Sequence, residues 1–340
     1  MRRRFWLLVA LATFGGWPAY SASIDAPAIN EAQWTEQKTV PGALSPTMVR
    51  LQVLLDRARF SPGEIDGKSG ENVDKAIAGF ATAQGAAAGS GMTADLWRVL
   101  SEAFKEPVII EHKISEIDVK GPFAEKIPAK LEDMKDLQAL SYTSVKEKLA
   151  EQFHMSPELL VALNPNSKFD KPGEAIMVAN VLGGKLHEKV ARIEIDKTKQ
   201  TMKVYGKSQT LLAMYPVTAG SKDKPAPEGV LKVTSVVKNP TYRYNPDYAF
   251  KGVKSKEPFT IKPGPNNPVG TVWIGLNKEG YGIHGTPEPS KVSKSESHGC
   301  IRMTNWDALQ LASALGKATP VEFIGDERAR AARKGQGKRS

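Results

Sequence analysis

The spacing of hydrophobic residues changes along the chain from a helical pattern to a strand-like one. In residues 44–105, apolar side chains recur at steps of three and four residues, which predicts three short helices. The clearest apolar stripe consists of Val73, Ala76, Ile77 and Phe80. We therefore expect residues 44–105 to form a small helical domain.

A second compact unit is predicted at residues 139–182. Ser144 and Glu147 fit a capping box, in which the serine oxygen accepts a main-chain N–H and the glutamate reaches back to the serine N–H. Ser156 before a proline is typical of the start of a second helix, and residues 176–178 are expected to form a returning strand. The predicted order within this unit is strand, helix, helix and strand.

In residues 188–325 the pattern is that of β-structure. Ile193 and Ile195 alternate with polar residues, and further short alternating segments follow between turn residues. A helix at residues 306–315 and a closing strand at residues 321–324 complete the pattern. The chain is therefore predicted to be a multidomain α+β protein, with two small modules ahead of a mostly-β sandwich.

The two ends of the chain differ from the parts between them. Three arginines, a short apolar run and a group of small residues predict a signal peptide over residues 1–23. Its apolar run is too short to span a bilayer, so no stable membrane span is expected after the signal is removed. Residues 326–340 are rich in basic residues and predict a disordered tail. We expect secretion across the inner membrane, to the periplasm or cell wall.

The charge of the chain narrows the choice of partners. Its formal net charge is +10 at pH 7, which favours attraction to anionic polymers of the cell envelope. Nucleic acid is not an expected partner, because the protein is predicted to be exported and no motif of basic and aromatic residues recurs.

The chain contains one cysteine, Cys300. In an exported protein an unpaired thiol is liable to oxidation or to a disulfide with another protein, so its presence indicates a function. The cysteine ends the segment Ser297-His298-Gly299-Cys300, and a second histidine, His284, lies upstream. A thiol near imidazoles is the composition of an activated nucleophile. The alternatives are an inert buried thiol and a structural zinc site, and zinc would need about four ligands. We therefore expect catalysis with no metal and no organic cofactor.

These motifs, together with residues 225–229 and 264–270, closely resemble the L,D-transpeptidase family (YkuD-like catalytic domain) over residues 188–325. The resemblance implies a mostly-β sandwich with an active site under a flap. It also implies peptidoglycan acyl transfer, in which a cysteine attacks the bond before the terminal D-Ala of a tetrapeptide stem. The acyl group then passes to a diaminopimelate amine, another amine or water.

The same resemblance implies a role for each residue of the motif. Cys300 would be the nucleophile and His284 the base, with the carbonyl of Gly285 orienting the imidazole. His298 would orient and tune the thiolate. The main-chain N–H groups of His298, Gly299 and Cys300 would stabilise the oxyanion.

Four further residues are candidates for substrate binding. Arg302 suits a substrate carboxylate, and the alternative for it is an ion pair with an acid such as Asp307. Ser297 is expected to fix the loop by hydrogen bonding, or to be an ordinary turn serine. Tyr281 and Trp273 could form walls of the cleft, although aromatic residues on strands often belong to the core.

Both N-terminal modules also resemble wall-binding domains. Residues 44–105 resemble a peptidoglycan-binding domain, through residues 51–55 and 63–67. Residues 139–182 resemble a LysM domain, which implies affinity for N-acetylglucosamine-containing glycans, although Thr143 and Ser144 replace the usual Gly-Asp. A packing or spacer role is the alternative for the first module.

The sequence therefore predicts an L,D-transpeptidase that forms 3-3 cross-links in peptidoglycan, with stem peptides and glycan as partners and carbapenem-type compounds as inhibitors. Three alternatives remain open at this point. Water as the acceptor would give an L,D-carboxypeptidase, and a lipoprotein amine would give attachment of that protein to the wall. The third alternative is a non-catalytic wall-binding protein.

Overall fold

The structure, a computed structural model, describes residues 24–35, 42–87, 89–181, 186–221, 224–248, 253–297 and 299–325. The predicted signal peptide at residues 1–23 and the predicted tail at residues 326–340 lie outside the described residues. Within the described ranges, no helix is both long enough and apolar enough to cross a membrane.

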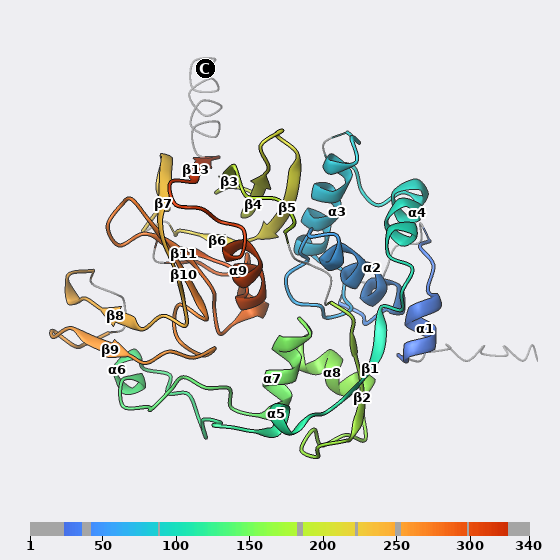
Figure 1. Cartoon of the computed structure of the whole chain (residues 1–340), viewed down its shortest axis with the longest axis horizontal. Coiled ribbons are helices and arrows are strands. Elements are labelled where there is room, and N and C mark those ends of the chain that lie inside the picture. The colour runs from blue at the N-terminus through green and yellow to red at the C-terminus, as the bar shows by residue number, and fades with distance from the viewer. Residues whose placement is uncertain are drawn as a thin grey trace, which may run out of the picture.

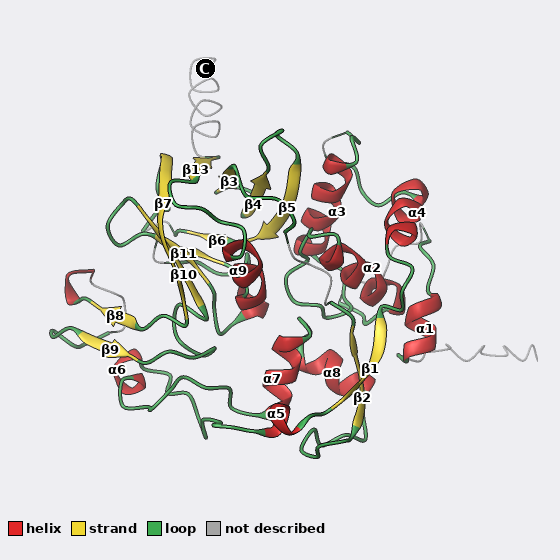
Figure 2. Ribbon diagram, viewed as in Figure 1, coloured by secondary structure: helices red, strands yellow, loops and turns green. Residues whose placement is uncertain are grey.

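Figures 1 and 2 show a mainly helical N-terminal half and a C-terminal half built on strands. Pro46 suits the first position of its helix, because that position needs no N–H. Thr93 caps another helix by accepting the N–H of Leu96 at 3.2 Å. Three of the first four helices lie where the apolar stripes predicted helices. The four are α1 (Ala26–Glu31), α2 (Pro46–Arg57), α3 (Glu71–Ala83) and α4 (Ala94–Ala103).

The next unit contains a two-stranded sheet whose strands pair antiparallel, with Ile109 opposite Ala179. The sequence predicted a strand before the two helices within residues 139–182, and no strand lies there. The sequence also predicts a strand at residues 107–110, upstream of that range, and this position overlaps the observed partner strand. The chain between strand and helices instead reaches the C-terminal half, where the N–H of Leu140 donates to the carbonyl of Pro263 at 3.0 Å. The elements are β1 (Ile109–Lys113), α5 (Glu116–Val119), α6 (Leu131–Met134), α7 (Val145–Gln152), α8 (Pro157–Leu163) and β2 (Ala175–Ala179).

Local signals set the starts of α7 and α8. The Ser144 Oγ accepts the N–H of Glu147 at 3.1 Å, as the capping box predicted. The reciprocal bond is displaced by one residue, because Glu147 Oε2 accepts the N–H of Thr143 at 2.6 Å instead of that of Ser144. Ser156 caps α8 through the N–H of Leu159 at 3.0 Å.

The two N-terminal units share one hydrophobic core. Leu54 of α2 and Phe80 of α3 belong to the same buried cluster as Leu160 of α8 and Val178 of β2. Met214, a residue of the C-terminal half, also belongs to this cluster. The N-terminal half is therefore packed as one body and not as two independent modules.

The C-terminal half is built on a nine-stranded sheet with the order β5-β4-β3-β13-β7-β10-β11-β12-β6. The first residues of β7 pair with β13 and the last with β10, so two parts of the sheet meet at this long strand. The helix α9 packs against β10 and β11, and β8 and β9 form a separate hairpin. The strands are β3 (Arg192–Asp196), β4 (Thr201–Tyr205), β5 (Leu211–Pro216), β6 (Thr218–Ala219), β7 (Gly229–Lys238), β8 (Tyr242–Tyr244), β9 (Phe259–Ile261), β10 (Val272–Leu276), β11 (Gly282–His284), β12 (Ile301–Arg302) and β13 (Pro320–Ile324); the helices are η1 (Pro246–Tyr248), η2 (Pro289–Lys291) and α9 (Asn305–Ala312).

The edge strand β5 of this sheet is covered by the N-terminal half. Phe60 forms a parallel bridge with Met214. The N–H of Ser61 donates to the carbonyl of Met214 at 2.9 Å, and the N–H of Met214 donates to the carbonyl of Arg59 at 3.0 Å. Helix α3 runs alongside β5 in Figure 1. The N-terminal half therefore occupies hydrogen-bonding groups that an open sheet edge would leave free.

Candidate active site

His284 is the last residue of β11 and is almost fully buried, with 4% of its surface exposed. Its Nδ1 lies 2.7 Å from the carbonyl oxygen of Gly285. Because a carbonyl oxygen can only accept, Nδ1 carries the proton and Nε2 is the nitrogen left to act as a base. Burial, together with the smaller effect of the nearby charge of Arg302, lowers the pKa of His284 to about 4, and the hydrogen bond to Gly285 opposes this shift. The imidazole is therefore neutral at neutral pH.

The indole of Trp273 packs on the ring of His284. The two residues are opposite one another on β10 and β11, with ring centroids 5.7 Å apart and planes 19° apart. A Cβ on Gly282 would lie 2.5 Å from the indole, so the glycine gives the ring its space. The sequence predicted Trp273 as a cleft wall, and the structure places it as a support of the imidazole.

Cys300 lies directly before β12, on the same side of the sheet as His284. Strands β11 and β12 run parallel, with Ile283 opposite Ile301 and His284 opposite Arg302. Alternate side chains of a strand point to the same face. Extending the register by one position therefore puts the side chains of Cys300, Arg302 and His284 on one face.

The surroundings of the Cys300 thiol act on its pKa in two directions. Burial raises this pKa, while a hydrogen bond from the Gly282 N–H and the charge of Arg302 lower it. The Sγ also lies 3.5 Å from the carbonyl oxygen of Gly280. Because the net shift is upward from an ordinary value of 9.0, the free thiol is mostly protonated at neutral pH. A base is therefore needed to generate the thiolate.

The loop before the thiol is shaped by Ser297 and Gly299. The Oγ of Ser297 donates to the carbonyl of Cys300 at 2.6 Å and accepts the N–H of Gly220 at 2.7 Å. Gly299 has φ of +98°, a left-handed conformation that favours glycine, and a Cβ there would lie 3.1 Å from the Tyr281 ring. Ser297 thus fixes the loop to a neighbouring strand. His298, the second residue of the motif, lies outside the described residues.

Arg302 is not paired with Asp307, the alternative partner that the sequence suggested. Its Nη1 donates to the main-chain carbonyl of Glu296 at 3.3 Å. Asp307 is buried elsewhere and accepts the hydroxyl of Ser61 at 2.9 Å. The guanidinium therefore remains close enough to Cys300 to affect the pKa of the thiol.

Tyr281 lies beside the nucleophile loop, on the turn before β11. The Nζ of Lys278 is 4.6 Å from the centre of its ring, and the ring is the nearest neighbour of the open side of Gly299. Tyr281 is partly exposed, and its place in a cleft wall stays a prediction. Within the described part of the chain, no group of three or more His, Cys, Asp or Glu residues could hold a metal ion.

Sequence reasoning missed Asn305, the first residue of α9. A Cβ on Gly285 would lie 2.1 Å from the Asn305 Oδ1, so this amide fills the space beside the glycine that orients His284. Its Oδ1 also accepts the N–H of Thr271 at 3.0 Å, and its Nδ2 donates to Glu151 on α7. No local pattern could have identified this residue, because all of these partners are distant in sequence.

Comparison with known proteins agrees with this geometry. Residues 190–323 match the model of the L,D-transpeptidase catalytic domain, YkuD. The chain is 28% identical over 179 residues to "Putative L,D-transpeptidase YkuD" of Bacillus licheniformis, covering 52% of this chain and 92% of that protein. It is 36% identical over 121 residues to "Putative L,D-transpeptidase YqjB" of Bacillus subtilis, covering 34% of this chain and 61% of the relative.

Among solved structures, the catalytic domain of an L,D-transpeptidase from E. faecium is 24% identical, with a TM-score of 0.31 and coverage of 41% of this chain and 99% of that domain. The residues that match the family model fall on the half of the chain that contains the nine-stranded sheet. The chain is a mixed α+β protein, and its C-terminal β-sheet domain, at residues 190–323, is an L,D-transpeptidase catalytic domain of the YkuD family.

Proposed function

We propose that this protein is a peptidoglycan L,D-transpeptidase that works through an acyl-enzyme on Cys300. The observation that carries the proposal is the common face of β11 and β12, where Cys300 lies on the same side as His284 and Arg302. These three residues offer a nucleophile, a neutral base and a cation within a domain of the L,D-transpeptidase family.

In the first step, Nε2 of His284 takes the proton of the thiol while Sγ attacks the carbonyl carbon before the terminal D-Ala. The resulting oxyanion accepts hydrogen bonds from main-chain N–H groups at Gly299 and Cys300. The C–N bond then breaks, the imidazolium returns its proton to the leaving amine, and D-Ala departs. The stem is left as a thioester on Cys300.

In the second step, the amine of a diaminopimelate side chain attacks the thioester. His284 takes a proton from the attacking nitrogen and returns one to the departing sulfur, so the free thiol and the neutral base are both regenerated. The new amide is a 3-3 cross-link. Water at the same position would instead release a tripeptide, which is the carboxypeptidase outcome.

Arg302 would bind a carboxylate of the diaminopimelate stem. A guanidinium matches a carboxylate in charge and in the geometry of its paired donors. The side chain is partly exposed and has no carboxylate partner among the contacts described above. A bound substrate carboxylate would therefore form the direct ion pair, whereas the charge of Glu288 acts on this guanidinium without a described contact.

The cell envelope is the proposed site of action, at the periplasm or cell wall. Its support is the signal-like composition of residues 1–23 and the location of the substrate. We further propose that the N-terminal half binds or orients glycan. The support for that role is the resemblance of residues 139–182 to a LysM domain, within which α7, α8 and β2 follow one another as helix, helix and strand.

Mass spectrometry of disaccharide-tetrapeptides tests the proposal. We expect the wild-type protein to release D-Ala and to form new dimers, and Cys300→Ala to lose this activity by roughly a thousandfold or more. A carbapenem should add its mass to the wild-type protein and not to Cys300→Ala.

The products distinguish the alternatives. Tripeptide without dimers would establish an L,D-carboxypeptidase. No reaction with either protein, and no carbapenem adduct, would contradict the acyl-enzyme and leave wall binding or a protein acceptor. Arg192→Met, a change at the surface of β3, is a control that should retain full activity.

A further inference from the structure

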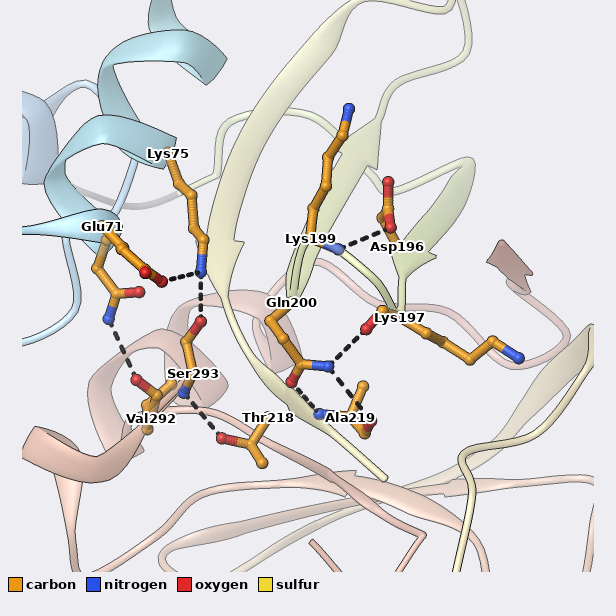
Figure 3. Close-up of polar contacts among 11 residues, drawn as sticks. Glu71, Lys75, Asp196, Lys197, Lys199, Gln200, Thr218, Ala219, Val292 and Ser293 are labelled. Atoms are coloured by element: carbon orange, nitrogen blue, oxygen red, sulfur yellow. Dashed lines mark hydrogen bonds and ion pairs between the residues drawn. The ribbon is translucent and has the colours of Figure 1, made fainter. Parts of the chain in front are cut away.

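The loop that joins His284 to Cys300 is held by a helix of the N-terminal half. Two side chains of α3 reach this loop, one turn apart on the same face of the helix. The Nδ2 of Asn72 donates to the carbonyl of Val292 at 3.2 Å, and the Nζ of Lys75 donates to the Oγ of Ser293 at 2.6 Å. Figure 3 shows the contacts of α3 with this part of the loop.

The contacts fall where the loop adopts an unfavourable backbone conformation. Ser293 has φ of +67°, in the left-handed region that residues other than glycine rarely adopt. Its N–H donates to the Oγ1 of Thr218 at 2.8 Å on the side away from Lys75 (Figure 3). Such a conformation is strained and persists when its surroundings determine it. Here α3 and β6 together supply those surroundings.

The same loop continues directly to the nucleophile. Four residues after Ser293, the N–H of Ser297 donates to the carbonyl of Gly220 at 3.1 Å, and Ser297 itself bonds to the carbonyl of Cys300. Strand β12 then pairs with β6, with Arg302 opposite Thr218. Thr218 is thus a shared anchor of the loop and of the strand after Cys300, and α3 provides the second anchor.

Burial makes the contacts of Asn72 and Lys75 more than surface interactions. Asn72 is 9% exposed, and the side chain of Lys75 is 19% exposed. The ion pair between Lys75 and Glu71 is weaker by comparison, because it spans 3.9 Å and the glutamate is 85% exposed. The hydrogen bond to Ser293 is therefore the contact through which Lys75 acts on the loop.

We propose that Asn72 and Lys75 are positioning residues for the transpeptidase reaction, which hold the loop so that Cys300 meets the substrate in a reactive geometry. The inference rests on the proposed role of Cys300 as the nucleophile. It gives the helical N-terminal module a role in the chemistry beyond any contact with glycan.

The test is the acylation of Cys300 by a carbapenem, measured as a limiting rate constant and an apparent binding constant. We expect Lys75→Met to lower the limiting rate roughly ten- to a hundredfold, because a small misplacement of a reacting group costs this much. The apparent binding constant should change little, and Lys75→Arg should restore most of the rate. Glu71→Gln, which removes the ion pair and keeps the hydrogen bond, is the matched control with an unchanged rate.

A double-mutant cycle shows whether the hydrogen bond carries the effect. If Lys75 acts through Ser293, Lys75→Met combined with Ser293→Ala should be no slower than the slower single variant. Unfolding temperatures of all variants separate loss of position from loss of the fold. An unchanged rate in Lys75→Met, an equal loss in Glu71→Gln, or full additivity in the cycle would overturn the proposal.

Failure of the proposed function would give a different result. If the wild-type protein neither accepts a carbapenem nor acts on muropeptides, the acyl-enzyme is contradicted. The positioning role of Lys75 is then tested by the rate at which iodoacetamide alkylates Cys300. Release of the loop should expose the thiol, so Lys75→Met should then be alkylated faster than wild type while Glu71→Gln is not. Equal alkylation rates would overturn the positioning role as well.

Discussion

At the scale of single residues, the charge of Arg302 acts on both groups that would exchange a proton. The guanidinium lowers the pKa of the Cys300 thiol and also lowers the pKa of His284. The first effect favours the thiolate, and the second keeps the imidazole unprotonated and able to accept. Arg302 would therefore prepare the pair for proton transfer in addition to binding a substrate carboxylate.

Arg302→Met should raise the pKa of Cys300, because the lowering effect of the guanidinium is lost and burial remains. The measurement is the rate of alkylation by iodoacetamide as a function of pH, and we expect the curve of the variant to move to higher pH. Arg302→Lys should move it less, since a positive charge is retained. Arg192→Met removes a charge that stacks on Tyr205 instead, and it should leave the curve in place. If the curve for Arg302→Met lies at the same pH as that of wild type, or at a lower pH, the effect of Arg302 on the thiol is contradicted.

The sequence identified the residues of the site that belong to a contiguous motif. The segments around His284 and Cys300 could be recognised because the spacing of histidine, glycine and cysteine is local information. Asn305, Asn72 and Lys75 could not, because their contacts to the site join positions far apart in the chain. A polar residue on a helix has no pattern that distinguishes a solvated side chain from one that holds a loop.

At the scale of helices and strands, features set by residues close together in the sequence could be predicted. Features set by residues far apart in the sequence could not. The starts of α7 and α8 followed from Ser144 and Ser156, because a cap involves residues only three positions apart. The pairing of β1 with β2 did not follow from the sequence, because a short strand is defined by its partner, and β2 lies beyond four helices. The packing of α3 on β5 could not be predicted either, because the spacing of apolar residues in a helix does not show which strand the helix covers.

The packing of α3 on β5 depends on a glycine. A Cβ on Gly79 would lie 2.9 Å from the Met214 Sδ and 3.0 Å from the Phe60 ring. We expect Gly79→Val to lower the free energy of unfolding by about 1–3 kcal/mol through overpacking. Urea unfolding measures the effect, and Ala78→Val, at the neighbouring and partly exposed position of the helix, is the control. Helix propensity alone would slightly favour Gly79→Val and disfavour Ala78→Val, so a Gly79→Val variant that is no less stable than Ala78→Val would contradict the contact with β5 as the source of the cost.

At the scale of the whole molecule, the junction between the halves contains three carboxyl groups that resist ionisation. Burial raises the pKa of Glu64, Glu151 and Asp307 to about 7 in each case. For Asp307, the charge of Asp56 adds to the effect of burial, while the hydrogen bonds from Thr304 and Ser61 and the charge of His154 oppose it. The first two residues also line a cavity of about 310 Å³ between the halves.

These groups make stability depend on pH. Between their ordinary values near 4 and the folded value of about 7, the folded state binds more protons than the unfolded one. The stability that they contribute is therefore complete at low pH and is lost as the pH rises through about 7. We expect Asp307→Asn to flatten the fall in unfolding free energy between about pH 4 and pH 7, whereas Asp95→Asn, at an exposed position of α4, should not. Parallel curves for wild type and Asp307→Asn would contradict this assignment.

The core of the N-terminal half has a consequence for the order in which the chain can fold. Met214 completes that core, and Leu140 is held by residues of the segment before β10, so both contacts need chain that is synthesised later. Closing such long loops is slow compared with forming local helices. We expect the helices of the first half to form early and to remain loosely packed until β5 arrives. The two halves should then reach their final state in one late, cooperative step, and the module that begins the chain would be among the last parts to be finished.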